Sequence, residues 1–125
     1  MSLSNPVQID VTTSYLKEQS EPTSKRFAFS YTITITNNGT STVQLLNRHW
    51  QISDDNNQVE EVKGEGVIGQ QPKIAPGENF TYTSGAIIRT EVGTMQGSYQ
   101  MCWADGLKFD ATIAPFLLAI PHTVH

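Results

Sequence analysis

A single run of strict alternation constrains the fold of this chain more than any other feature of its sequence. Between Arg26 and Asn37, apolar residues occupy every second position, and small, mostly polar residues fill the positions between them. The apolar set is Phe27, Phe29, Tyr31, Ile33 and Ile35. Because successive side chains of a strand point to opposite faces, the pattern predicts a strand with one buried and one solvated face.

Alternation and turn signals also account for the rest of the chain. A weaker alternation from Val7 to Tyr15 predicts an earlier strand, and a polar linker over 17–25 separates the two. The triplet Asn37-Asn38-Gly39 predicts a tight turn, because Asn and Gly tolerate a positive φ angle. Further strands are predicted at 43–53, 58–62, 80–88, 93–103 and 107–120.

Two of these segments support finer predictions. In 43–53, Leu46, Trp50 and Ile52 fall on one parity and are expected to face the core. In the last strand the apolar parity changes near Pro115, so we expect a bulge there on an edge strand.

About seven short strands with no helical period predict an all-β chain, an antiparallel β-sandwich of the immunoglobulin-like or fibronectin type III-like kind. With Cys102 as its one cysteine, the chain lacks the Cys…Trp…Cys spacing of true immunoglobulin domains, so the second label fits better. Its 125 residues are expected to form a single domain over 1–125. Tyr99 is a candidate tyrosine-corner residue, whose hydroxyl would bond back to the main chain.

The segment Gly64–Gly69 carries a motif that suggests a ligand. Gly64, Gly66 and Gly69 match the Gly-x-Gly-x-x-Gly fingerprint of pyrophosphate-binding loops. That fingerprint acts where glycines leave a strand and open a helix, and the prolines from Pro72 onward prevent a helix here. Turn architecture is the competing explanation, although turn amides can form an anion-binding nest without a helix. The three glycines are kept as candidate phosphate-binding residues.

Charge limits the ligands that the chain can bind. Twelve acidic and eight basic residues give a net charge of −4, and no run of Lys or Arg occurs. Nucleic-acid binding needs a basic face and is therefore not expected. Glu60, Glu61 and Glu65 near the glycines also disfavour phosphate. The nearest basic residues in sequence are Lys63, Lys73 and Arg89.

Neither a metal site nor a catalytic centre emerges from the sequence. The oxygen-rich turn 54–57 lacks the Gly and Glu that a calcium loop needs in register, and His49 is more typical of a structural histidine. His122 and His125 form a terminal pair without a coordination sphere. No Gly-x-Ser-x-Gly elbow is present, and no base can be assigned to Cys102. We expect no catalytic residue, no metal ligand and no cofactor.

Hydropathy and the lone cysteine bear on location. The segment 1–6 lacks the basic and apolar regions of a secretory signal. The longest apolar run, 114–121, is far shorter than the roughly 20 residues that a membrane-spanning helix needs. We expect a cytoplasmic protein that does not insert into a membrane.

Longer strings of residues resemble the bacterial ApaG family. They read QLLxRHWxIxD over 44–54, VxGxGVxGxQPxIxPGExFxYxSG over 62–85 and GTMxGxYxM over 93–101. The resemblance extends over nearly the whole chain, from about 15 to 121. One departure is Ala114, which separates Ile113 from Pro115 where the family usually places the proline directly after the isoleucine.

The resemblance implies a fibronectin type III-like sandwich and an association with cobalt tolerance and magnesium efflux in bacteria. It also implies kinship with an interaction domain of eukaryotic F-box and polymerase-associated proteins, and a glycine motif suspected of binding pyrophosphate. No catalytic residue comes with it.

Three functions stay open at this point. The first is a non-enzymatic module that binds a protein partner and contributes to divalent-cation homeostasis. The second is a binder or weak hydrolase of a nucleotide or polyphosphate at the Gly64–Gly69 hairpin. The third is direct chelation of Co²⁺ or Mg²⁺, for which no ligand set can be named. The oligomeric state is also open, since an unprotected edge strand could pair with another copy.

Overall fold

The computed structural model describes residues 5–121 and consists of β-strands with two short 3₁₀ turns in the first linker. The elements are β1 (Val7–Tyr15), η1 (Lys17–Gln19), η2 (Pro22–Ser24), β2 (Phe27–Asn37), β3 (Val43–Asp54), β4 (Val59–Glu65), β5 (Lys73–Ile74), β6 (Asn79–Ile88), β7 (Val92–Trp103) and β8 (Lys108–Ala119). Seven of the strands coincide with the predicted ones. The eighth, β5, has two residues and is too short to show a period. Within 5–121, no helix is long and apolar enough to cross a membrane.

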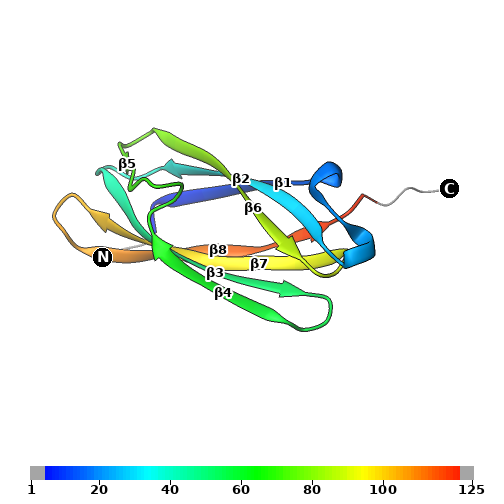
Figure 1. Cartoon of the computed structure of the whole chain (residues 1–125). Helices are drawn as coiled ribbons and strands as arrows, with labels where there is room; N and C mark the ends of the chain where they lie inside the picture. The colour runs from blue at the N-terminus through cyan, green and yellow to red at the C-terminus, as the bar shows by residue number, and fades with distance from the viewer. Residues whose placement is uncertain (1–4, 122–125) are drawn as a thin grey trace.

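Two antiparallel sheets pack face to face, which confirms the predicted sandwich (Figure 1). One sheet has the order β1-β2-β6, and the other has the order β4-β3-β7-β8, with β5 paired to the beginning of β3. Strands β1 and β8 contact each other and close one side of the sandwich, whereas β6 and β4 do not close the opposite side.

The core lies between the sheets and follows the alternation of the sequence. Phe29, Ile33 and Ile35 of β2 face Met95 and Tyr99 of β7, and none of the five is more than 1% exposed. Burying a large apolar side chain of this kind contributes roughly 1.5–3 kcal/mol, so this double row contributes a substantial part of the driving force for folding.

A bulge in β3 corrects one expectation about the core. Leu45 pairs with Met101, and Asn47 pairs with Gln100, so Leu46 is an extra residue without a partner on β7. The bulge reverses the parity of the strand. Leu45 is therefore fully buried, and the prediction that Leu46 faces the core with Trp50 is wrong.

A second bulge lies where the sequence predicts it. On β8, Ala114 and Pro115 lie between two pairs, Ile113 with Gly97 and Phe116 with Met95. Two residues of β8 thus oppose one residue of β7, and the buried parity switches across them. β8 is an edge strand, where a proline costs no ladder hydrogen bond.

The segment after β2 crosses from one sheet to the other instead of making a tight hairpin. Neither Asn38 nor Gly39 has a positive φ angle, contrary to the prediction. The buried Asn37 side chain organises the crossing: its Nδ2 donates to the carbonyls of Ser41 (2.8 Å) and Ile74 (2.9 Å), and its Oδ1 accepts from the Gly39 amide (2.9 Å). The asparagine acts here through its side chain, not through its tolerance of positive φ.

Candidate functional site

The glycine segment joins β4 to β5, and both of these strands pair with the side of β3 that faces away from β7 (Figure 1). Gly64 lies in β4 and pairs with Arg48. The Gly66 amide donates to the Leu46 carbonyl (2.8 Å), and Gln71 Nε2 donates to the same oxygen (3.0 Å). Both ends of the segment are therefore anchored on the bulge of β3.

Between these anchors the chain makes a two-residue hairpin turn. The Val67 amide donates to the Gln70 carbonyl (2.8 Å), and the Gln70 amide donates back to Val67 (2.9 Å). The two central residues, Ile68 and Gly69, have φ angles of 43° and 76°, as a type I′ turn requires. A β-branched residue at positive φ is strained by an order of 1–3 kcal/mol, so Ile68 sits in this turn at a cost.

The predicted phosphate-binding glycines thus occupy three different environments. Gly64 is a strand residue, Gly66 begins the turn and Gly69 lies at its exposed tip. The segment continues into β5, so its glycines do not open a helix. At the tip, the amides of Ile68 and Gly69 have no main-chain acceptor within the described part of the chain.

Arg48 is the functional candidate that sequence reasoning missed. Its Nη1 donates to the carbonyls of Glu65 (3.0 Å) and Gly66 (2.9 Å), and its guanidinium occupies the place where a Cβ on Gly64 would lie, 2.8 Å from such an atom. Among residues 5–121 no carboxylate lies within ion-pair distance of it. One feature of the sequence could have identified Arg48, since it lies two residues before Trp50 and therefore shares its inward parity.

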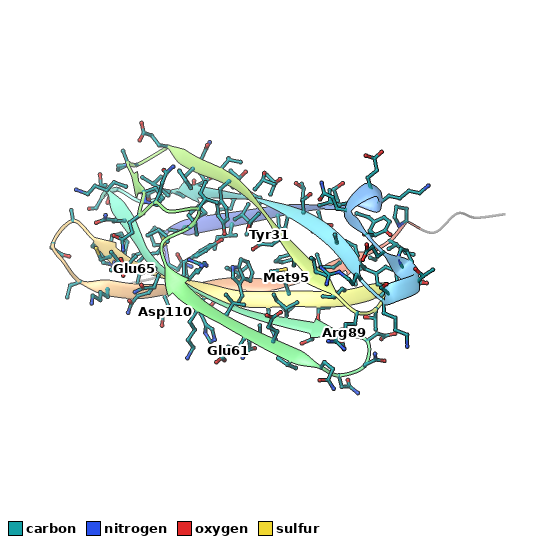
Figure 2. The ribbon with its side chains drawn as sticks, in the orientation of Figure 1. Tyr31, Glu61, Glu65, Arg89, Met95 and Asp110 are labelled. Carbon is teal, nitrogen blue, oxygen red and sulfur yellow. The ribbon has the colours of Figure 1, made fainter. Side chains whose placement is uncertain are left out.

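A cavity of about 230 Å³ lies beside this guanidinium, between the two sheets. Its wall comprises Tyr31, Trp50, Tyr82 and Ser84 together with the turn 67–69. In Figure 2, Tyr31 is seen between the sheets, whereas Glu61 projects from the outer side of β4. Val67 is 1% exposed and packs into the core beside the cavity. The hairpin therefore covers one end of the open side.

At the wall of the cavity, Tyr82 hydrogen-bonds to a second buried tyrosine, Tyr99. The hydroxyls of Tyr82 and Tyr99 form this bond across the sandwich, and Tyr99 stacks edge-to-face with Trp50. Burial raises the pKa of both phenols well above the usual value, so both stay neutral at physiological pH. Tyr99 bonds to a side chain and not to the main chain, so it does not form the tyrosine corner considered above.

Two further hollows continue along the open side. One, of about 520 Å³, is lined by Ile52, Val62 and Ala86, among others, and the next, of about 540 Å³, lies beside Asp54 and Arg89. Both are lined by Ile52, Glu60 and Ile87, so they are adjacent. The Arg48 cavity and these two hollows follow one another along β3 and β6, and we call the three together the side groove, which lies between β6 on one side and β3 and β4 on the other.

The other polar residues singled out in the sequence serve local structure. His49 Nε2 lies 3.0 Å from Glu61 Oε2, and this hydrogen bond and the nearby Lys63 ammonium lower the pKa of the Glu61 carboxyl. Asp54 Oδ1 accepts from the amides of Asn56 (2.8 Å) and Gln58 (3.0 Å) and so fixes its own turn. Within the described residues no three His, Cys, Asp or Glu side chains gather as a metal site would require. His122 and His125 lie outside those residues.

Comparison with known proteins finds a matching family model, similar sequences and similar solved structures. The family model of the ApaG domain matches residues 17–103. The Protein ApaG of Pseudomonas entomophila (strain L48) is 60% identical over 119 residues, covering 95% of this chain and 94% of that protein, and the Protein ApaG of Thiobacillus denitrificans is 56% identical over 119 residues, with the same coverage. A crystal structure of a Bordetella pertussis protein described as ApaA superposes with a TM-score of 0.91 at 47% identity, covering 94% of this chain and 95% of that one.

Proposed function

The chain belongs to the ApaG family, and we propose that it is a non-enzymatic module that binds a protein partner through the side groove. The observation that carries this proposal is the open side of the sandwich. There Ile52, Val62 and Ala86 are only partly buried and form an apolar floor, while Glu60 and Arg48 supply charge along it. Protein interfaces combine an apolar centre with a polar rim in this way.

A non-enzymatic role is supported by what the groove offers chemically. Its buried titratable groups include Tyr82, whose raised pKa keeps the phenol neutral, and no nucleophile paired with a base lines the groove in the described part of the chain. Cys102 lies half-buried on another face, beside Lys73.

We include a role in divalent-cation homeostasis because the family resemblance implies it, and a cytoplasmic location because the lone Cys102 fits a reducing compartment. Within 5–121 no three His, Cys, Asp or Glu side chains gather as a metal site would require. The proposed route to a cation phenotype is therefore indirect, through the partner.

Affinity capture from cells whose cobalt sensitivity changes on deletion of the gene tests this proposal. We expect a partner that the wild-type chain captures and that Val62→Lys loses, together with its ability to restore cobalt tolerance, because the ammonium would lie in the apolar floor. Leu117→Lys is the matched control, since Leu117 lies on β8 at the closed side of the sandwich, away from the side groove, and is 56% exposed. Melting curves verify that both variants fold. Absence of a specific partner, or equal capture by both variants, would contradict the proposal.

A phosphate-containing ligand is the second candidate, and Arg48 is the observation that favours it. A nucleotide or polyphosphate held at Gly64, Gly66 and Gly69, or slowly hydrolysed there, needs a cation beside the turn, and the Arg48 guanidinium lies there without a carboxylate partner among residues 5–121. Its Nη1 is engaged by two carbonyls, which leaves Nε and Nη2 for an anion.

Amide NMR spectra decide between the two candidates. We expect the amides of 61–71 to remain unshifted when pyrophosphate, ATP or a dinucleoside polyphosphate is added at millimolar concentration, with or without Mg²⁺ or Co²⁺. Saturable shifts confined to this segment, and abolished in Arg48→Gln, would instead establish the phosphate ligand.

A further inference from the structure

The four edge strands of the sandwich are not equally protected against pairing with another strand. Charged residues or proline occur in three of them: Asp10 in β1, Glu60, Glu61, Lys63 and Glu65 in β4, and Lys108, Asp110 and Pro115 in β8. The fourth, β6, has ten residues with no charge and no proline. Charges and prolines are how edge strands avoid unwanted pairing. Of the four edge strands, β6 is therefore the one best suited to pair with an added strand.

The outer edge of β6 is also free of main-chain partners. Its ladder bonds go to β2, and no backbone hydrogen bond from another described segment reaches 79–88. The hairpin tip lies near Tyr82 and Ser84, yet it donates no backbone bond to them. Every second residue of β6 therefore directs an N–H and a C=O away from the sheet.

The side groove runs along this free edge. Ser84 and Ala86 of β6 are small, and across the groove lie Ile52 and Val62. A strand added beside β6 would direct alternate side chains against Ile52 and Val62 and the others toward solvent. From Ser84 to Ile88 this requires an added segment of about five residues.

Charge distinguishes the two ends of the groove. Arg48 lies at the end next to the glycine hairpin and pairs with no carboxylate within 5–121, whereas Arg89 shares its end with Asp54 and Glu60. A half-buried guanidinium with free donors favours a carboxylate or other anion. An acidic side chain of the ligand would be held at the Arg48 end.

We propose that β6 accepts an extended segment of a protein partner as an additional strand, with apolar side chains in the side groove and an acidic residue at Arg48. This inference rests on the proposed protein-binding function and specifies its ligand. Main-chain hydrogen bonds supply the affinity of such a complex, and alternate side chains supply its specificity.

Selection of random displayed peptides of about twelve residues on the whole chain, followed by N-methyl scanning of a selected peptide, tests strand addition. We expect selected peptides to alternate apolar and polar residues and to carry Asp or Glu near one end. N-methylation at every second amide should weaken binding by about tenfold, since it removes a ladder hydrogen bond and adds a clash, while the intervening amides should tolerate it. Failure to select any peptide, or uniform tolerance of N-methylation, would overturn the inference.

A double-mutant cycle tests the charge at Arg48. We expect Arg48→Gln and replacement of the peptide's acidic residue by its amide each to weaken binding, and the two changes together to cost no more than one. Arg89→Gln is the matched control at the other end of the groove. Additive effects would refute the contact. If Arg48→Gln folds poorly, Arg48→Lys takes its place in the same cycle, since it keeps the charge but loses the forked donors.

Two further outcomes separate this inference from the function on which it rests. A captured partner that Val62→Lys releases, but whose isolated segment tolerates N-methylation throughout, would leave the binding function intact and eliminate strand addition. A concentration-dependent dimer in sedimentation, dispersed by Thr83→Lys on β6, would make a second copy the occupant and would also overturn the inference.

Discussion

Gly97→Ala is expected to destabilise the chain by about 3 kcal/mol or more, a large fraction of the roughly 5–15 kcal/mol that stabilises an ordinary domain. A Cβ on Gly97 would lie 1.9 Å from the His49 carbonyl oxygen and 3.1 Å from Trp50 Cα. Both are main-chain atoms of the neighbouring strand β3, so no side chain can move aside. Gly97 does not have a positive φ angle, and its requirement for glycine comes from the close approach of β7 to β3 alone.

Chemical denaturation followed by tryptophan fluorescence measures this loss, because Trp50 is 2% exposed in the folded chain and unfolding transfers it to water. Ser98→Ala is the matched control, because Ser98 is the next residue of the same strand, and its change should remain within about 0.5 kcal/mol of wild type. Equal midpoints for the two variants would show that the two strands can separate without cost. The result also bears on the site, because β3 carries Arg48 two residues before Trp50.

The sequence predicts the layers of this fold well because most of its strands obey a period of two. Pro115 even marks the bulge of β8, since a proline and a change of parity coincide there. The bulge at Leu46 escapes prediction because it contains neither glycine nor proline, and an apolar residue precedes it. Asn37 misleads for a related reason: its side chain replaces the backbone turn that its residue type suggests.

The candidate site was harder to predict than the fold. Arg48 has inward parity, which indicates a charged side chain between the sheets, but its contact with Gly64 depends on the register of β3 against β4. Register is set by packing and bulges, so a linear sequence does not reveal it. The sequence motif treats its three glycines as a unit, whereas in the structure different contacts and backbone angles constrain each of them.

Substitution of the three motif glycines one at a time is expected to give three different losses of stability. Gly66→Ala should cost about 3 kcal/mol or more, since its φ angle is 63° and an added Cβ would lie 2.2 Å from the Gln70 carbonyl oxygen. That oxygen accepts the Val67 amide, so it cannot move without opening the turn. Gly69→Ala should cost about 1 kcal/mol, because its φ angle is 76° but no atom lies near the added group.

Gly64→Ala should have a distinct signature. The atoms that its Cβ would meet belong to the guanidinium of Arg48, the far end of a flexible side chain that can swing away. We expect a loss of about 1–2 kcal/mol as Arg48 leaves the carbonyls of Glu65 and Gly66. Loss of the Arg48 side-chain contacts in NMR spectra would accompany it.

Gly69→Asn completes the series as a control, because asparagine tolerates positive φ and should keep nearly wild-type stability. Denaturation midpoints of the four variants then separate turn architecture from ligand recognition. If the motif exists for the turn and for Arg48, the losses follow the order Gly66, Gly64, Gly69. Three similar small losses would instead mean that the glycines are dispensable for folding, and their presence would then have to be explained by a ligand that approaches the backbone closely.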